Sequence, residues 1–174
     1  MQDLRQKITG KEDLQGKLKS LASSVPGFGG YFAKDSRRDA DKLLRLHLAG
    51  KLADERKRMR AQATKLGAAN LQKVRELDKS IGRLQTLTDK IKNATYGAGS
   101  LFDAVRVKEE QLDALYTYDN SMLDGVPLLT TAITALAAAV KAKEGVDEAL
   151  EAVDEAVDKL ATAWNLRQDV LLQS

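Results

Sequence analysis

The chain has 174 residues, of which 43% are hydrophobic, 30% are charged and only 5% are aromatic. This length fits one domain with a sizeable core, and few aromatic residues beside many Ala, Leu, Lys and Glu favour long helices over a β-sheet. Because there is no cysteine and only one histidine, a disulfide framework is excluded, and the usual zinc and di-iron sites lack their ligands. The composition predicts an all-α protein without a cofactor.

Charge is distributed unevenly along the chain, although the formal net charge is only +3. Residues 1–100 contain 22 Lys and Arg against 11 Asp and Glu, whereas residues 101–174 contain 6 against 14. Either a basic half packs on an acidic half, within one copy or head to tail between copies, or the basic half faces an anionic partner. We favour the internal explanation.

Neither the N-terminus nor the apolar segments suggest export or membrane insertion. The chain begins Met-Gln-Asp-Leu-Arg without an apolar signal region, and its longest stretch of low polarity is residues 126–140. That stretch is too short and too rich in Thr and Ala for a bilayer span, which needs about 20 apolar residues. The sequence predicts a cytoplasmic protein with no transmembrane segment.

Residues 1–33 predict a short N-terminal helix followed by an aromatic, Gly-rich loop. The loop holds Phe28, Tyr31 and Phe32, a large share of the aromatic residues in the chain. Such a group either plugs the end of a helical bundle or forms an exposed anchor for a partner. We favour the plug, and retain the three side chains as candidate partner contacts.

Residues 36–95 predict a basic helical hairpin. Ser36 can begin its first helix as a cap, Gly67 can end that helix, and Asn70 can cap the second. The short connection makes the two helices antiparallel neighbours. The first apolar stripe is Ala40, Leu44, Leu48, Leu52, Met59, Ala63 and Leu66. The second stripe is Leu71, Val74, Leu77, Ile81, Leu84, Leu87, Ile91 and Ala94.

The face opposite the first stripe is charged and is predicted to be solvated and laced with local pairs. Its residues are Arg38, Asp39, Asp41, Lys42, Arg45, Asp54, Glu55, Arg56, Lys57, Arg58, Arg60 and Lys65. The compact basic group within it, Arg56, Lys57, Arg58 and Arg60, is the part of this face that best suits contact with a partner. Phosphate contacts need only well-placed Lys and Arg, but the basic segments lack interleaved aromatics and any helix-turn-helix or zinc signature.

Residues 107–173 predict an acidic helical hairpin that turns at Gly145. Steps of alternately three and four residues mark a long packed seam in each helix. The first seam is Leu112, Leu115, Asp119, Met122, Val126, Leu129, Ile133, Leu136 and Val140. The second is Val146, Leu150, Val153, Val157, Leu160, Trp164, Arg167 and Leu171. Together the hairpins predict one domain, residues 1–174, in which two antiparallel helical hairpins and a shorter N-terminal helix form a bundle with coiled-coil-like packing.

Two irregularities interrupt these seams. Asp119 and Arg167 are their polar exceptions and lie at similar distances from Gly145, so we predict an ion pair, or a shared network with Tyr116, that fixes the register of the hairpin. Gly125 and Pro127 predict a bend or hinge, since proline removes one backbone hydrogen bond. Replacing Pro127 with Ala should straighten or stabilise the helix if the bend is dispensable.

The sequence offers little for catalysis. His47, the only histidine, flanks the first apolar stripe and is predicted to be a boundary residue with its tip in water, and neither Glu-x-x-His nor Gly-x-Ser-x-Gly occurs. The sequence therefore favours a non-enzymatic scaffold or adaptor that binds proteins and self-associates, with no metal. The alternative is a binder of anionic surfaces, nucleic acid or an acidic membrane, through the basic half.

Overall fold

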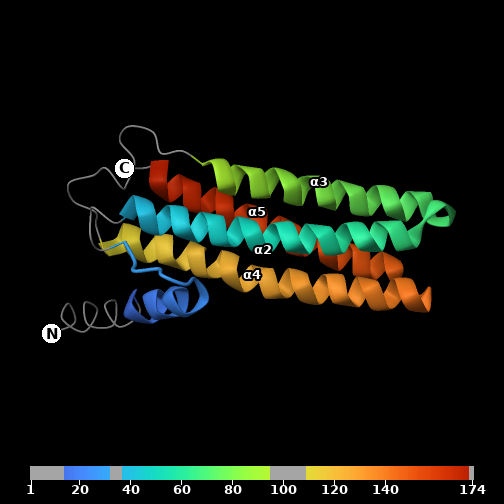
Figure 1. Cartoon of the computed structure of the whole chain (residues 1–174), viewed down its shortest axis with the longest axis horizontal. Coiled ribbons are helices and arrows are strands. Elements are labelled where there is room, and N and C mark those ends of the chain that lie inside the picture. Colours follow the sequence, from blue (N-terminus) through green and yellow to red (C-terminus); the bar gives the residue numbers. More distant parts are fainter. Residues whose placement is uncertain (1–13, 32–36, 95–108, 173–174) are drawn as a thin grey trace.

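The computed structural model describes residues 14–31, 37–94 and 109–172, and every regular element within them is helical. The four long helices are α2 (Arg37–Leu66), α3 (Leu71–Asn93), α4 (Glu109–Ala142) and α5 (Val146–Leu172). They lie side by side with their axes roughly aligned (Figure 1), while the shorter helical stretch of residues 14–24 lies against α4 near one end. This confirms the predicted all-helical bundle. The candidate contact Phe32 and the candidate cap Ser36 fall outside the described residues.

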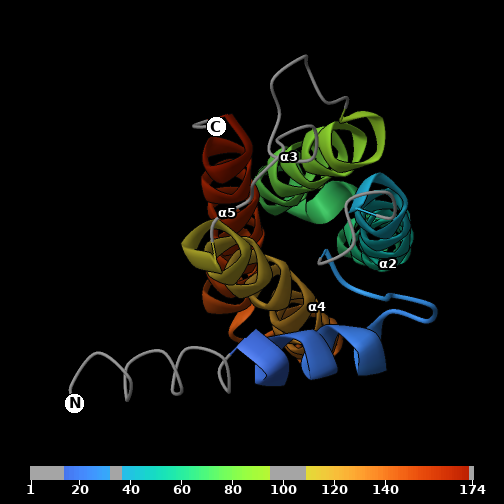
Figure 2. The same ribbon diagram turned by 90° about the vertical axis from the view of Figure 1, so that its left-hand side faces the viewer.

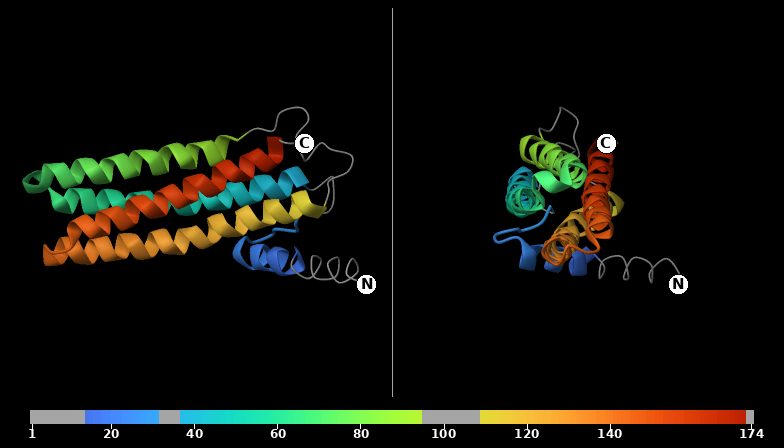
Figure 3. Two further views of the ribbon diagram at one scale, coloured as in Figure 1. Left: turned by 180° about the vertical axis from the view of Figure 1, so that it is seen from behind. Right: turned by 90° about the vertical axis from the view of Figure 1, so that its right-hand side faces the viewer.

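The four long helices enclose one core, as the views from behind and from the end show (Figure 3). α2 packs against α3 and α4, and α5 packs against α4 and α3. The chain turns after α2 at Gly67 and after α4 at Gly145, where φ is +65° and +66°. Glycine suits both turns because a side chain strains this left-handed backbone conformation.

The predicted seams are the buried faces of the helices. Every seam position of α4 and α5 is buried except Val140, which is partly buried against the core. The stripe of α2 is buried in the same way, with Ala63 partly buried. In α3 the stripe is buried from Leu77 to Ile91, whereas Leu71 at its start is 58% exposed, contrary to the prediction.

Asn70, in the connection between α2 and α3, does not cap α3 as predicted. The single 3₁₀ turn η2 (Ala68–Asn70) joins the helices, and the Asn70 side chain caps nothing at the start of α3. Its amide nitrogen instead donates to the backbone oxygen of Leu66 at 3.2 Å. The last carbonyls of a helix have no partner within the helix, so Asn70 stabilises the end of α2.

Opposite charges of the two halves meet between α3 and α5. Lys73 pairs with Asp147 at 2.6 Å, and Arg83 pairs with Asp154 at 2.7 Å and with Asp158 at 2.6 Å. Since these pairs are partly exposed, each is worth at most about 1 kcal/mol. They nevertheless show that part of the charge asymmetry is matched within one copy.

α4 has an unusually apolar composition for a helix of a charged bundle. Residues Glu110–Ala142 are long and apolar enough to cross a membrane by length and composition, and 28% of their most apolar window is buried inside the bundle. Core helices of soluble bundles share this length and composition. The predicted lack of a transmembrane segment stays a prediction.

α4 is continuous through Gly125 and Pro127. A Cβ atom at Gly125 would lie 2.7 Å from Cδ2 and 3.2 Å from Cγ of Leu160, a residue of α5 that is only 2% exposed. Gly125 therefore allows α4 and α5 to approach closely, a role that the sequence did not indicate. Motion at Gly125 and Pro127 stays a prediction.

Replacement of Gly125 with Ala should lower the free energy of unfolding by about 1–3 kcal/mol, because the added methyl group overpacks against a buried side chain. Gly82 is the matched control, since it lies inside α3 with no atom near the position of an added Cβ. Gly82→Ala should stabilise the protein by about 0.5–1 kcal/mol. Urea unfolding of both variants is the measurement, and equal shifts would contradict the close approach.

Candidate functional site

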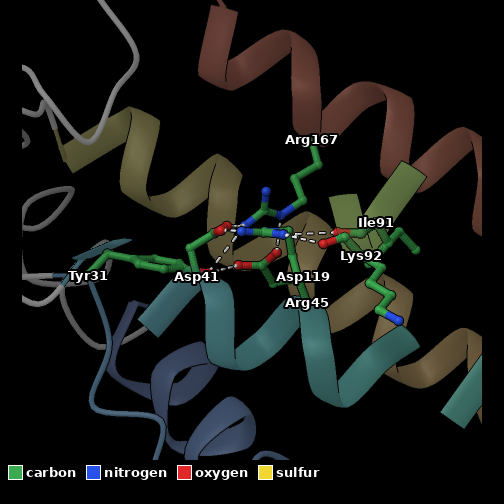
Figure 4. Close-up of polar contacts among 7 residues, drawn as sticks. All are labelled: Tyr31, Asp41, Arg45, Ile91, Lys92, Asp119 and Arg167. Carbon is green, nitrogen blue, oxygen red and sulfur yellow. Dashed lines mark hydrogen bonds and ion pairs between the residues drawn. The ribbon is translucent and has the colours of Figure 1, made fainter. Parts of the chain in front are cut away.

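A cluster of polar side chains is buried at the end of the bundle on which residues 14–31 pack (Figure 4). Its members come from four parts of the chain, and we call them the polar cluster. They are Tyr31 from the segment before α2, the α2 residues Asp41 and Arg45, Asp119 of α4, and Arg167 of α5. Each is at most 7% exposed. Burial of so many polar groups demands that they satisfy one another.

Arg167 lies at the centre of the polar cluster. Its Nε donates to Oδ1 of Asp119 at 2.5 Å, and its Nη2 donates to Oδ1 of Asp41 at 2.6 Å. All three side chains have no exposed surface. The structure thus places the two polar seam positions of α4 and α5 in direct contact and adds a second carboxylate from α2.

Asp41 and Arg45 extend the cluster to α3. Nε of Arg45 donates to Oδ2 of Asp41 at 2.6 Å, and Nη1 of Arg45 donates to the backbone oxygens of Ile91 and Lys92, each at 3.1 Å. These carbonyls belong to the last turn of α3, where a positive charge also interacts favourably with the helix dipole. Arg45 therefore holds the end of α3 to α2.

Tyr31 attaches the segment before α2 to the cluster. Its hydroxyl donates to Oδ2 of Asp119 at 2.8 Å, and its backbone nitrogen donates to the Tyr116 hydroxyl at 2.7 Å. The rings of Tyr31 and Tyr116 stack with centroids 5.2 Å apart, and Phe28 meets Tyr31 edge-on at 5.3 Å. Nε of Arg37 donates to the backbone oxygen of Tyr31. These contacts fix the aromatic loop against the bundle.

Phe28 and Tyr31 are only 4% and 0% exposed. Their prediction as partner contacts is therefore wrong, because a buried ring has no surface that could touch a partner. Both side chains fill the space between residues 14–31 and the long helices, as the plug interpretation expected. Gly30 supports the same close fit, since a Cβ there would lie 2.7 Å from Leu18 and 3.0 Å from the Tyr116 hydroxyl.

Every carboxylate oxygen of the polar cluster has a hydrogen-bond donor within the cluster. Each of the two oxygens of Asp41 and of Asp119 accepts at least one hydrogen bond from an Arg or Tyr of the cluster. Two carboxylates face two guanidinium groups, so the cluster is formally neutral. Within the described residues, no group of three or more His, Cys, Asp or Glu side chains is placed to hold a metal ion. The arrangement suits a structural role, in which the groups bind one another.

Nη1 of Arg167 and Nε2 of His47 are among the buried atoms that have no hydrogen-bond partner within the described residues. The Arg167 guanidinium lies 5.5 Å from the centroid of the Trp164 ring, which gives it a favourable cation–π contact. Burial lowers the pKa of His47, and the nearby Lys51 lowers it further. The prediction that the His47 side chain ends in water is wrong, because its Nε2 is buried.

The predicted basic group on α2 is divided by its local contacts. Arg58 donates to Glu55 at 2.8 Å and to the Thr134 hydroxyl at 2.9 Å, and Lys57 donates to Asp54 at 2.9 Å. Arg56 is half-buried and Arg60 is exposed. Arg58 is thus held between α2 and α4, whereas the Lys57 pair is exposed. Partner binding by this group stays a prediction.

Ionisation of the buried tyrosines should make the fold sensitive to alkaline pH. Burial raises the pKa of Tyr31 well above 10.0 and raises that of Tyr116 to about 12. The unfolded chain loses these protons near pH 10, while the folded chain keeps them. The stabilisation is therefore complete below pH 10 and is lost as the pH rises through the folded pKa values, by about 1.4 kcal/mol per pH unit for each tyrosine.

Urea unfolding across this alkaline range measures that slope. Tyr31→Phe should reduce the slope by about half, since one of the two buried phenols is removed. Tyr118→Phe is the control, because Tyr118 lies on the same helix as Tyr116 but is only half-buried. A slope that Tyr31→Phe leaves unchanged would contradict the assignment.

In comparisons with protein families, curated proteins and solved structures, nothing matches this chain. Function must therefore be argued from the geometry of the bundle and its surfaces.

Proposed function

We propose that the protein is a non-enzymatic helical bundle that works as a scaffold or adaptor, binding proteins through its surface and associating with itself. The polar cluster supports this proposal because its acidic and basic groups are bound to one another. The same groups are then not available to bind or transform a substrate. Two antiparallel hairpins with coiled-coil-like packing, forming one domain, are part of the proposal, and the turns at Gly67 and Gly145 support them.

The observation that carries the proposal is the outer side of α4. From Gly125 to Val140 this helix has no charged residue, whereas exposed positions of α2, α3 and α5 carry many charges. Leu128 is 62% exposed on this side. Five exposed residues share one side of the helix, and we call them the outer α4 face: Leu128, Thr131, Ala135, Ala138 and Ala142. A contiguous apolar surface on a charged protein is typical of an interaction site.

Light scattering on the purified chain over a range of concentrations tests the self-association. The expected mass is a multiple of 19.0 kDa that falls toward the monomer on dilution. A monomer at every concentration would remove self-association from the proposal.

An alternative is binding of an anionic surface, nucleic acid or an acidic membrane, by the basic half of the chain. Its support is the excess of Lys and Arg over acidic residues in residues 1–100. Filter binding of nucleic acid and flotation with acidic vesicles, each at low and raised salt, test it. Salt-sensitive retention would favour this alternative, because release of counterions makes such binding weaken as salt rises. Retention that salt does not change, or none, would exclude it.

A further inference from the structure

We propose that the self-association surface is the outer α4 face, and that two copies pack α4 against α4 antiparallel about a two-fold axis that crosses the helices at the level of residue 133. The inference rests on the proposed self-association and adds the surface, the orientation and the register. Such a contact is isologous, so the same face must be complementary to itself. Shape, hydrogen bonding and charge each meet this condition.

The shape of the face is self-complementary in this register. At about 100° per residue, its members fall on one side of α4, within about 40° of a common direction. In an antiparallel pair centred at residue 133, Leu128 of each copy lies opposite Ala138 of the other, and Thr131 lies opposite Ala135. A large residue thus meets a small one at the edge of the contact, and only small residues meet at its centre, where the backbones approach.

A surface hollow borders the face at Ala138. It has a volume of about 530 Å³ and lies between the ends of α2 and α4. Its lining residues are Lys65, Ala137, Ala138, Val140 and Lys141. Only Ala138 of its lining belongs to the outer α4 face, because the other α4 residues of the lining turn toward α2. The opposing Leu128 packs against Ala138 and loses the exposure that it has in one copy.

The threonines of α4 do not resist this burial. The hydroxyl of Thr131 donates to the backbone oxygen of Pro127 at 3.0 Å, and that of Thr134 donates to the backbone oxygen of Thr130 at 2.8 Å. Since the donors are satisfied within the helix, desolvation of this side of α4 leaves no hydroxyl hydrogen without a partner.

Charge at the two ends of the face selects an antiparallel copy. Asp124 lies on the same side of the helix one turn before Leu128, and Lys141 flanks the far end; both are exposed. They lie about 13 Å and 12 Å from residue 133 along the axis, so the two-fold brings each Asp124 level with the Lys141 of the other copy. A parallel copy would instead place like charges together.

Residues 14–24 leave this face free. They are tied to the first half of α4, where Lys17 pairs with Asp113 at 2.5 Å and its backbone oxygen accepts from Asn120 at 3.1 Å. In Figure 2 this helix lies across α4. Ser24 reaches the level of Asp124 and Pro127, where it shares a hollow with residues of α2, so the segment lies on the α2 side of α4 and flanks the end of the paired region.

Cross-linking tests the register, and the absence of cysteine from the chain makes the experiment simple. A mixture of Leu128→Cys and Ala138→Cys chains should form a mixed disulfide dimer under mild oxidation. Leu128→Cys alone should form little dimer, because its two copies lie about 15 Å apart along the axis. Equal cross-linking of the mixture and of the single variant would overturn the register.

Sedimentation equilibrium tests the surface. Ala135→Arg should raise the dimer Kd about 30-fold or more, since a charge is buried at the centre of the contact. Ala152→Arg, also an Ala→Arg change at an exposed helix position, but on α5, should leave the Kd unchanged. Asp124→Lys and Lys141→Asp should each weaken the dimer, and combining them should restore it.

The outcomes separate this inference from the proposed function. A dimer that persists in Ala135→Arg keeps self-association and overturns the α4 surface. A monomeric unmodified chain overturns both. A monomer that floats with neutral vesicles, and loses this binding in Ala135→Arg, assigns the face to a lipid surface and overturns the two-fold pair.

Discussion

Replacement of Arg167 with Met should lower the free energy of unfolding by about 3–5 kcal/mol. The substitution removes the partner of two carboxylates, Asp119 and Asp41, which have no exposed surface. Breaking a buried ion pair from one side is far more costly than the pair is worth, because the remaining charge stays buried without a partner. Denaturant unfolding followed by circular dichroism measures the loss.

A double-mutant cycle isolates the pair itself. Asp119→Asn should also destabilise the protein, but Asp119→Asn combined with Arg167→Met should cost about 1–3 kcal/mol less than the sum of the two single changes. The reason is that the double variant leaves no unpaired charge at Asp119, while Arg45 still neutralises Asp41. Additive effects would show that Asp119 and Arg167 do not stabilise each other.

Lys57→Met is the matched control for the cycle. Lys57 and Asp54 form an ion pair on the same bundle, but their side chains are 76% and 72% exposed. An exposed pair is worth at most about 1 kcal/mol. If Arg167→Met prevents folding altogether, a cycle of Asp119→Asn with Tyr31→Phe measures the neighbouring contact of the polar cluster, in which the Tyr31 hydroxyl donates to Asp119.

The sequence predicts the contact between Asp119 and Arg167 because each is the polar member of an otherwise apolar seam. A heptad repeat fixes which face of a helix is buried, and a charge on that face needs a partner of opposite sign at the same level. The same reasoning predicts the four long helices and their buried faces, since local spacing alone carries this information.

The sequence predicts Asp41 and Arg45 on a solvated face, and this prediction is wrong because both side chains are buried. Both flank the buried stripe of α2 at a helical spacing of four, which is the usual pattern of an exposed ion pair. Only the carbonyls at the end of α3 and the guanidinium of Arg167 explain their burial. Such partners come from distant parts of the chain and leave no local pattern. The one hint in the sequence is that the apolar Ala49 continues the row of Asp41 and Arg45 at the same spacing of four, and Ala49 is buried.

Glu55 is another charged residue of α2 that is buried by partners from a distant part of the chain. The sequence places it on the charged face, but it is only 9% exposed, because its carboxylate accepts from Thr130 of α4 at 2.7 Å and from Arg58. The position of α4 against α2 decides this burial, and no feature of the α2 sequence does.

The polar cluster also makes the two ends of the bundle different. At one end, Asp41, Asp119 and Arg167 must meet, whereas toward Gly145 the seams are apolar. Apolar seams tolerate several registers, because one Leu packs much like another. A shift of one helix by a turn would leave at least one charge of the cluster buried and unpaired. The cluster therefore specifies register, and the apolar seam supplies most of the stabilisation.

Leu128 and Leu129 separate the inner and outer sides of α4 in one experiment. Leu129 has no exposed surface and lies on the seam, while Leu128 is 62% exposed on the outer α4 face. Leu129→Ala should lower the free energy of unfolding by about 2–5 kcal/mol, because it opens a cavity in the core. Leu128→Ala should change it by less than about 0.5 kcal/mol when measured on the monomer at low concentration.

The order reverses when dimerisation is measured. Leu128→Ala should weaken the dimer, since Leu128 packs against Ala138 of the other copy, whereas Leu129→Ala should leave the dimer Kd of the folded fraction nearly unchanged. Adjacent leucines thus serve different faces of one helix, because successive residues point about 100° apart. Equal effects of the two substitutions on unfolding, or on dimerisation, would contradict this division of α4 into a core face and a contact face.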